Sequence, residues 1–293
     1  MRIIVPVVPG SFTDLVGRAL AAEMTESLGQ SVLVENRPGA GTTIGASVVA
    51  KATPDGYTLL MTENSFSIAP ALYGAQTPFD PIRDFQPVTL IAEAPTVWFA
   101  RLEFAARTPR ELVQLARARP GELTFATGGN GTSSHLAAEL FIDRNKLKMI
   151  HVPFKGVAGS IAEIVAGRVD VGTSSIASAV ASIQAGRMRA LAVTGRERNS
   201  LLPDVPTFAE SGFADYDMPI WFGIIGPAGL PAARLERLHA EIVRATERPR
   251  LRDLLSSQGA RALLTPPGPF AKRVQGEIAQ WREVIARVGV RAD

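Results

Sequence analysis

The stretch Arg2-Ile-Ile-Val-Pro-Val-Val-Pro-Gly-Ser-Phe-Thr-Asp14 decides the fold. It reads as a short apolar strand, a loop of Pro, Gly and Ser, and then a helix over 13–28 that Gly29 closes. The loop is therefore predicted to lie at a helix N-terminus, where unpaired backbone N–H groups and the positive end of the helix dipole attract anions. Because no basic side chain is needed there, this loop is the first candidate for a functional site.

The first third of the chain continues this alternation of strands and helices. Apolar runs predict strands over 3–8, 32–35 and 57–62, and helical periodicity predicts helices over 13–28 and 43–52. This βαβ rhythm is typical of a largely parallel sheet.

The first helix is predicted to be amphipathic. Its apolar side, which includes Leu15, is expected to pack in the core, whereas Arg18, Glu23 and Glu26 are expected to face water.

A second α/β series follows Arg101 and runs to Thr194. Two extended segments that carry aromatic residues, 89–100 and 218–228, bracket this series as the two crossings of a hinge would. The predicted fold class is therefore α/β, with two Rossmann-like lobes joined by a two-strand hinge. Lobe one is predicted to comprise residues 1–99 and 222–293, and lobe two residues 100–221.

Composition limits the classes of function. The chain has 293 residues, 46% of them hydrophobic, which is enough to bury a sizeable core. No apolar run approaches the roughly 20 residues needed to cross a bilayer. The formal net charge is only +3 and the basic residues are scattered, which argues against a nucleic-acid partner. Cysteine is absent, so the sequence excludes disulfides, thiolate catalysis and cysteine metal sites.

The cellular compartment is less well defined by the residues. A chain without cysteine fits an oxidising compartment such as the periplasm. Met1 directly precedes the first predicted strand, with no leader in front of it. Two interpretations follow: a leader was removed or mis-annotated, or the protein is cytoplasmic.

Three further junctions between strands and helices share the small polar character of the first loop, namely 62–65, 127–134 and 172–175. In parallel α/β sheets such junctions lie at the carboxyl edge, where ligands bind. Two lobes that face each other would bring the four loops together at a ligand cleft. Capping of the following helix is the alternative explanation for each loop taken alone, and without a lysine after its glycines the 128–134 segment is no Walker A loop.

Enzymatic and metal sites find little support. The only histidines are His135, His151 and His239, and no His-Glu-x-x-His motif or nucleophile elbow is present. Ser134 and His135 are adjacent on a helix and point in different directions, so His135 is predicted to be a cap or packing residue. We therefore expect no catalytic residue, no metal and no cofactor.

Two acids in these loops have two interpretations each. Asp14 would either orient a ligand or support the first helical turn through the dipole. Glu63 would either be a solvated loop acid or, in a cleft, receive an ammonium or hydroxyl group.

A set of motifs in a fixed order extends along the chain and closely resembles the Bug (Bordetella uptake gene) family, the solute-binding proteins of tripartite tricarboxylate transporters. The motifs are Ile4-Val-Pro-x-x-Pro-Gly10 with Asp14, Val34-Glu-Asn-Arg-Pro-Gly-Ala-Gly41, Pro54-Asp-Gly-Tyr-Thr-Leu59, Gly131-Thr-Ser-Ser-His-Leu-Ala137, His151-Val-Pro-Phe-Lys-Gly156, Gly167-Arg-Val-Asp170, Leu191-Ala-Val-Thr194, Pro203-Asp-Val-Pro-Thr-Phe-Ala-Glu-Ser-Gly212 and Trp221-Phe-Gly223. Each is weak alone, but the ordered set is specific.

The resemblance implies a type II periplasmic-binding-protein fold that closes on a small carboxylate without catalysis. It implies a periplasmic, extracytoplasmic solute receptor, expected to be a monomer, whose partners are the membrane permease subunits of the transporter. The ligand would be held by backbone N–H groups, hydroxyls and waters. The residues that it points to are Val8, Pro9, Ser11, Asp14 and Ser65 in lobe one, and Gly129, Thr132, Ser133, Ser134, Ser174 and Ser175 in lobe two.

Three departures from the family pattern bear on the ligand. Residues 7–11 read Val-Val-Pro-Gly-Ser where the family usually has Phe-Pro-Pro-Gly-Gly, and 62–65 replace a Gly- and Thr-rich loop. Ser174 and Ser175 stand where an Asp-Asn pair is common. Citrate-like acids, C4-dicarboxylates, acidic amino acids, nicotinate and aromatic dicarboxylates all remain compatible.

Two other functions stay open at this point. The same domain could signal to a histidine kinase of a two-component system, which neighbouring genes would reveal. An α/β enzyme that acts on a carboxylate is the third hypothesis, and recovery of intact ligand after incubation would exclude it.

Overall fold

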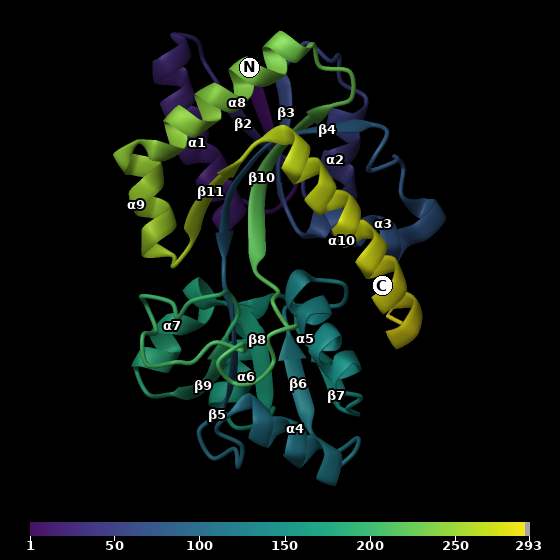
Figure 1. Ribbon diagram of the computed structural model, residues 1–293, viewed down its shortest axis with the longest axis vertical. Coiled ribbons are helices and arrows are strands. Elements are labelled where there is room, and N and C mark those ends of the chain that lie inside the picture. Colours follow the sequence, from purple (N-terminus) through teal and green to yellow (C-terminus); the bar gives the residue numbers. More distant parts are fainter. Residues whose placement is uncertain (291–293) are drawn as a thin grey trace. The chain divides into compact units, whose positions relative to one another are not determined.

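The computed structural model describes residues 1–290, so residues 291–293 of the predicted first lobe lie outside the described residues. The chain divides into two compact units. Unit 1 comprises Met1–Glu93 and Trp221–Ile285, and unit 2 comprises Ala94–Ile220 together with residues 286–290. Each unit is an α/β structure with one sheet of its own (Figure 1).

Unit 1 contains a six-stranded sheet in the order β11-β4-β10-β3-β1-β2. Its strands are β1 (Arg2–Val5), β2 (Leu33–Asn36), β3 (Thr58–Glu63), β4 (Phe85–Ala94), β10 (Ile220–Pro227) and β11 (Arg261–Thr265). Its helices are α1 (Phe12–Leu28), η1 (Ala40–Thr42), α2 (Thr43–Ala50), α3 (Ser65–Tyr73), η2 (Gly74–Gln76), α8 (Ala232–Glu247), α9 (Pro249–Ser257) and α10 (Pro267–Val288), the last of which extends beyond Ile285.

Three neighbouring parallel strands, β2, β1 and β3, bring their carboxyl ends to one edge of this sheet. β1 pairs in parallel with both β2 and β3, with Val5 opposite Asn36 and Ile4 opposite Leu60. The carboxyl ends of these three strands therefore lie at the same edge of the sheet, and the loops that follow them start side by side.

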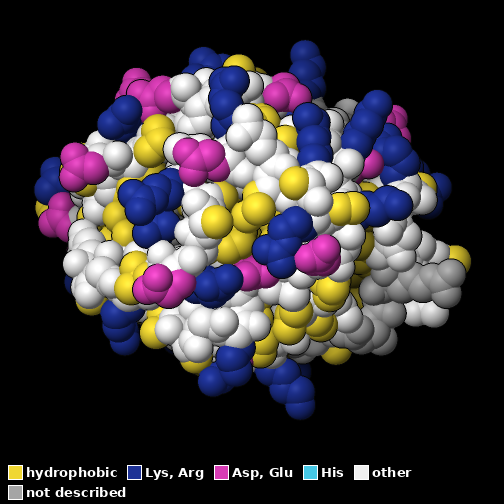
Figure 2. Space-filling view, turned by 90° about the horizontal axis from the view of Figure 1, so that it is seen from below, with side chains coloured by type: hydrophobic (Ala, Val, Ile, Leu, Met, Phe, Trp, Pro, Cys, Tyr) yellow, Lys and Arg dark blue, Asp and Glu magenta, His cyan; other side chains and the backbone are white. Residues whose placement is uncertain are grey.

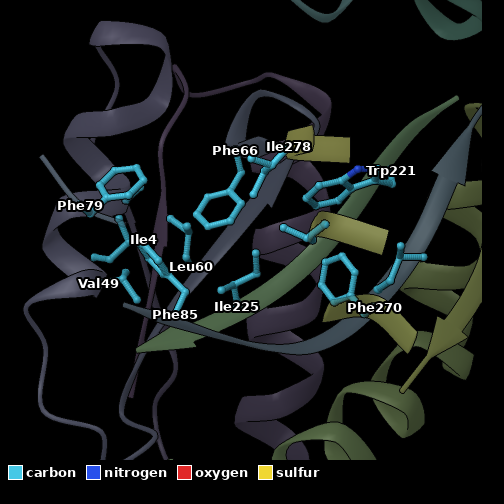
Figure 3. Packing of buried hydrophobic residues seen from close by; sticks show 13 residues of the cluster. Ile4, Val49, Leu60, Phe66, Phe79, Phe85, Trp221, Ile225, Phe270 and Ile278 are labelled. Carbon is cyan, nitrogen blue, oxygen red and sulfur yellow. The ribbon is translucent and has the colours of Figure 1, made fainter. Parts of the chain in front are cut away.

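Helices cover both faces of the unit 1 sheet (Figure 1). Successive strand residues point to opposite faces, so Val5 approaches Gly17 of α1 while Ile4 packs on the other face. On that second face a cluster of buried side chains, many of them aromatic, packs α3 and α10 against the sheet (Figure 3). Phe66, Phe79 and Phe85 contact one another, with ring centroids 4.9 to 6.2 Å apart.

Unit 2 contains a five-stranded sheet in the order β7-β6-β8-β5-β9. Its strands are β5 (Thr96–Arg101), β6 (Thr124–Thr127), β7 (Ile150–Pro153), β8 (Val171–Ser175) and β9 (Met188–Val193). Its helices are α4 (Pro109–Ala118), α5 (Ser133–Arg144), α6 (Val157–Val165) and α7 (Ile176–Gln184). β6 is parallel to both β7 and β8, whereas β5 is antiparallel to β8 and β9.

The position of β5 differs from the boundaries given above. Residues 94–99, assigned there to lobe one, belong to unit 2, because Thr96–Arg101 forms ladder hydrogen bonds with β8 and β9. Trp98 is buried in this unit, and its Nε1–H donates to the hydroxyl oxygen of Tyr216 at 3.0 Å. The passage from one sheet to the other therefore falls near Pro95.

The first helix also departs from its predicted faces. Leu15, expected in the core, is 41% exposed, whereas Glu23 is buried and lies 3.5 Å from the Arg250 guanidinium. Arg18, expected to face water, is exposed as predicted, and its guanidinium also bonds to Asp14 and Asn36. Glu23 is buried because α8 and α9 pack against α1, and a helical wheel of α1 alone does not show these neighbours.

Within residues 1–290, no helix is both long enough and apolar enough to span a bilayer. On the face shown in Figure 2, Lys and Arg side chains are interspersed with Asp and Glu.

Candidate functional site

The loop after β1 leads directly into the N-terminus of α1. Ser11 is the N-cap residue, and its Oγ accepts a hydrogen bond from the Asp14 N–H at 3.3 Å. Gly10 has φ +83°, a left-handed conformation that favours glycine. Val8 is 61% exposed, and Pro9 and Gly10 are exposed beside it. The predicted residues Val8, Pro9, Ser11 and Asp14 therefore share one loop.

Asp14 is buried within a hydrogen-bond network. Its Oδ2 accepts from the Gly10 N–H at 2.9 Å and from Arg18 Nε at 3.0 Å, and its Oδ1 accepts from Asn36 Nδ2 at 2.8 Å. Burial raises the pKa of Asp14, but the hydrogen bonds from Arg18, Gly10 and Asn36 outweigh it, so the net pKa lies below its usual value. These contacts make Asp14 part of the scaffold of the loop, and its direct contact with a ligand stays a prediction.

Asn36 is a residue of this edge that sequence reasoning missed. It ends β2, and its Nδ2 donates to the Val7 carbonyl at 3.1 Å as well as to Asp14. The available signal was its position at the end of a predicted parallel strand, next to the loop after β1. Asn36 ties that loop to the neighbouring strand.

The end of β3 supplies the other polar group of residues in unit 1. Ser65 begins α3, and the Oδ1 of the preceding Asn64 accepts from the Trp221 N–H at 2.8 Å. Three buried side-chain oxygens, Thr62 Oγ1, Glu63 Oε2 and Ser65 Oγ, have no hydrogen-bond partner by distance and angle within the described residues. Burial raises the pKa of Glu63. Since β3 neighbours β1 in the sheet, Ser65 starts from the same edge as the loop after β1.

In unit 2 the loop after β6 leads into α5. Thr132 is the N-cap residue, and its Oγ1 accepts from the His135 N–H at 3.3 Å and donates to the Gly129 carbonyl at 2.8 Å. Ser134 is buried, and its Oγ accepts from the Gly128 N–H at 3.2 Å. Ser133 makes no side-chain hydrogen bond within the described residues. The predicted residues Gly129, Thr132, Ser133 and Ser134 thus form one loop at one helix N-terminus.

The loops after β1 and β6 follow the same local plan. In each, a glycine with positive φ precedes the N-cap residue, Gly10 at +83° and Gly131 at +68°. In each, the glycine N–H donates to a side chain four residues on, which is Asp14 Oδ2 at 2.9 Å in unit 1 and His135 Nδ1 at 3.0 Å in unit 2. In both loops, a hydrogen bond from the glycine N–H to a side chain of the following helix therefore fixes the conformation of the loop at the helix N-terminus.

His135 belongs to a stack of rings beneath the loop after β6. The His135 and His151 rings are nearly parallel, with centroids 3.8 Å apart, and Phe125 stacks on His151 at 4.8 Å. His135 Nε2 lies 3.4 Å from Glu139 Oε1. His135, predicted to be a cap or packing residue, does pack, and it also accepts a backbone hydrogen bond.

Ser174 and Ser175 end β8, which neighbours β6. Ser174 is buried and its Oγ donates to the Ser175 carbonyl at 2.9 Å, whereas Ser175 Oγ lies 2.9 Å from Ser178 Oγ. Thr173 Oγ1, one residue earlier, is buried without a partner within the described residues. The sheet of unit 2 thus places this pair at the same edge as the loop after β6.

A cavity of about 440 Å³ lies elsewhere in unit 1, beside Met1, Leu28, Tyr57, Arg237 and Leu238. Met1 and Tyr57 precede β1 and β3, so this cavity lies at the opposite edge of the sheet from the predicted loops. Among residues 1–290, no group of three or more His, Asp or Glu side chains could hold a metal ion.

Comparisons with known proteins agree with one another. The sequence profile of the tripartite tricarboxylate transporter family receptors matches residues 16–290. The protein BugT of Bordetella pertussis is 31% identical over 292 residues, which cover 99% of this chain and 90% of that protein. The solved structure of the periplasmic binding protein BugD is 31% identical with a TM-score of 0.81, and the alignment covers 100% of this chain and 98% of BugD.

Two similar structures contain carboxylates. MatC of Rhodopseudomonas palustris, with bound malate, is 32% identical with a TM-score of 0.82, over 97% of this chain and 98% of that one. A second R. palustris protein, with adipate, is 30% identical with a TM-score of 0.84, over 99% and 97% of the two chains. The predicted fold class, with two lobes of the periplasmic-binding-protein type, is confirmed.

Proposed function

The chain belongs to the tripartite tricarboxylate transporter family receptors, and from that premise we propose that it is a periplasmic receptor that binds a small carboxylate and delivers it to a membrane permease. The family consists of solute-binding receptors and is not a class of enzymes. The observation that carries the proposal is the repeated loop plan, in which β1 leads to the N-terminus of α1 and β6 leads to that of α5. Such helix N-termini bind anions through backbone N–H groups.

The proposed ligand contacts are the predicted residues. In unit 1 they are Val8, Pro9, Ser11, Asp14 and Ser65, and in unit 2 they are Gly129, Thr132, Ser133, Ser134, Ser174 and Ser175. The buried, unpartnered atoms Thr62 Oγ1 and Thr173 Oγ1 at the two strand ends support this choice, since buried polar atoms normally have a partner.

The first test compares charged and uncharged ligands of one shape. Malate and adipate, which similar proteins hold, should raise the melting temperature, because a ligand that binds only the folded state stabilises it. Their diamides should not, because they carry no anionic charge for the N–H groups to bind. Equal stabilisation by acids and diamides would contradict the proposal.

The second test uses two capping threonines of unit 2. Thr132 caps α5 and Thr108 caps α4, and each Oγ1 accepts one backbone N–H. Thr132→Ala and Thr108→Ala should each cost about 1 kcal/mol of stability. Only Thr132→Ala should also weaken carboxylate binding. Ser133→Ala should weaken binding with little change in the stability of the empty protein, and an unchanged affinity in both binding-loop variants would contradict the assignment.

The transport step requires its own experiment. Deletion of the gene should abolish uptake of the radiolabelled carboxylate, and expression of the wild-type chain should restore it. Normal uptake together with a lost transcriptional response to the carboxylate would favour a sensing role instead.

A further inference from the structure

We propose that His135 is a positioning residue that must be neutral to hold the loop after β6, so that this loop loses its binding conformation on acidification while the loop after β1 keeps its own. The inference deepens the proposed function and rests on it for the effect on ligand affinity. Its first step, the effect on the loop itself, rests on the geometry of unit 2 alone.

The hydrogen bond from Gly131 fixes the protonation state of His135. The Gly131 N–H donates to Nδ1 at 3.0 Å, so Nδ1 carries no hydrogen. In the neutral ring the hydrogen is then on Nε2, which lies 3.4 Å from Glu139 Oε1. A second proton on Nδ1 would direct two N–H groups at each other, and the Gly131 bond would be lost.

His151 extends the coupling to the rest of the loop. Its ring stacks on that of His135 with centroids 3.8 Å apart, so two positive charges would repel strongly if both rings were protonated. Its Nε2 shares a hydrogen bond of 2.7 Å with Thr127 Oγ1, which also accepts the Gly129 N–H at 3.3 Å. The titratable groups that contact the His135 ring are thus one carboxylate, Glu139, and one second imidazole, His151.

The comparison with Asp14 gives the direction of the effect. Asp14 and His135 occupy equivalent places, each accepting the N–H of the glycine four residues before it. A carboxylate remains an acceptor throughout the neutral and mildly acidic range, whereas histidine gains a proton between about pH 8 and 5. Glu139 supplies a negative partner for the charged ring, so protonation of His135 is compatible with the fold and releases Gly131.

The first experiment needs no ligand. Amide hydrogen exchange of Gly131 is measured by NMR in the wild type and in His135→Leu, His135→Asn and His239→Asn. Asn retains an acceptor near the position of Nδ1 and does not titrate, whereas Leu has none. His239, whose Nδ1 bonds to Thr89 Oγ1 in unit 1, provides the matched control.

The expected result is faster exchange at Gly131 in His135→Leu, by about fivefold to tenfold, as for loss of one hydrogen bond. Exchange in His135→Asn and His239→Asn should match the wild type at pH 8. Between pH 8 and 5, after correction for intrinsic exchange, protection should fall in the wild type but not in His135→Asn. Equal exchange in the Leu variant and the wild type, or equal disturbance by Leu and Asn, would overturn the positioning role.

The second experiment measures adipate affinity by calorimetry at pH 8, 7 and 6. Because titration of adipate itself is common to all proteins, the ratio of wild-type to His135→Asn affinity reports the protein alone. That ratio should fall by about fivefold to tenfold from pH 8 to 6. The ratio of His151→Gln to His135→Asn affinity should fall by a similar factor. A constant ratio, or a fall abolished only by His151→Gln, would overturn the proposal. Failure of every protein to bind any of the carboxylate classes named in the sequence analysis would contradict the proposed function, while Gly131 exchange would still decide the role of His135.

Discussion

The loop after β1 and the loop after β6 share a backbone plan but differ in the chemistry that braces them. Both have a glycine with positive φ, a hydroxyl N-cap and an acceptor four residues after the glycine. In unit 1 the acceptor is the Asp14 carboxylate, which also bonds to Arg18 and Asn36. In unit 2 the acceptor is the imidazole of His135, and the side chains of the loop above it are uncharged hydroxyls. One plan is therefore fixed by ion pairing and the other by stacking and hydroxyl bonds.

The comparison predicts its largest effect at Asp14. Asp14→Asn places an amide where three donors converge, so it should lower the free energy of unfolding by about 2 to 4 kcal/mol. The measurement is urea unfolding followed by tryptophan fluorescence. Glu26→Gln, on the exposed side of the same helix, is the control and should change stability little. A stable Asp14→Asn protein that has merely lost ligand affinity would show that Asp14 acts on the ligand and not on the loop.

Glycine substitutions should separate backbone cost from site geometry. Gly10 and Gly29 lie before and after α1, both have positive φ, and an added Cβ would meet nothing within 4 Å at either position. Gly10→Ala and Gly29→Ala should therefore each cost about 1 kcal/mol of stability, because alanine rarely adopts that conformation. Only Gly10→Ala should weaken carboxylate binding. Equal effects of both on binding would show that the loop after β1 has no special place in the site.

Acid titration should also tell the two loops apart. Asp14 has a lowered pKa in the folded protein, so its stabilising contribution is complete above its unfolded pKa of about 4 and is lost as the pH falls through the folded value. The difference in melting temperature between the wild type and Asp14→Asn should therefore be constant from pH 8 to 5 and shrink below about pH 4. A difference that already shrinks between pH 7 and 5 would assign the effect to another group.

The sequence predicted the contacts between residues close together in these loops, but it missed the contacts that depend on how the strands pair. Ser11 and Thr132 could be found because a cap and the N–H it accepts are three residues apart in the chain. The contact of Asn36 with Asp14 could not, because it requires β1 and β2 to pair with Val5 opposite Asn36. The bond from the exposed Arg18 to Asn36 could not be predicted for the same reason, since Asn36 lies in β2.

Two further features were missed, the acceptor role of His135 and strand β11. A histidine next to Ser134 predicts packing or capping, but its role as an acceptor depends on the positive φ of Gly131. Strand β11 was also absent from the prediction, because its pairing with β4 joins segments about 170 residues apart and is interrupted by a register shift. Periodicity within one segment carries no information on such long-range pairing.

The smallest predicted effect concerns Glu63, which has no acidic counterpart at the β8 strand end of unit 2, where Thr173, Ser174 and Ser175 stand. Burial raises the pKa of Glu63, so its ionised form costs stability, and that cost appears as the pH rises through the raised value. Glu63→Gln should therefore stabilise the empty protein at pH 8 by no more than about 1 kcal/mol, and by less at pH 5. Thermal melts at the two pH values, with the exposed Glu283→Gln as control, provide the measurement. Destabilisation at pH 8 would mean that the charged carboxylate stabilises this strand end, contrary to the cost that its burial predicts.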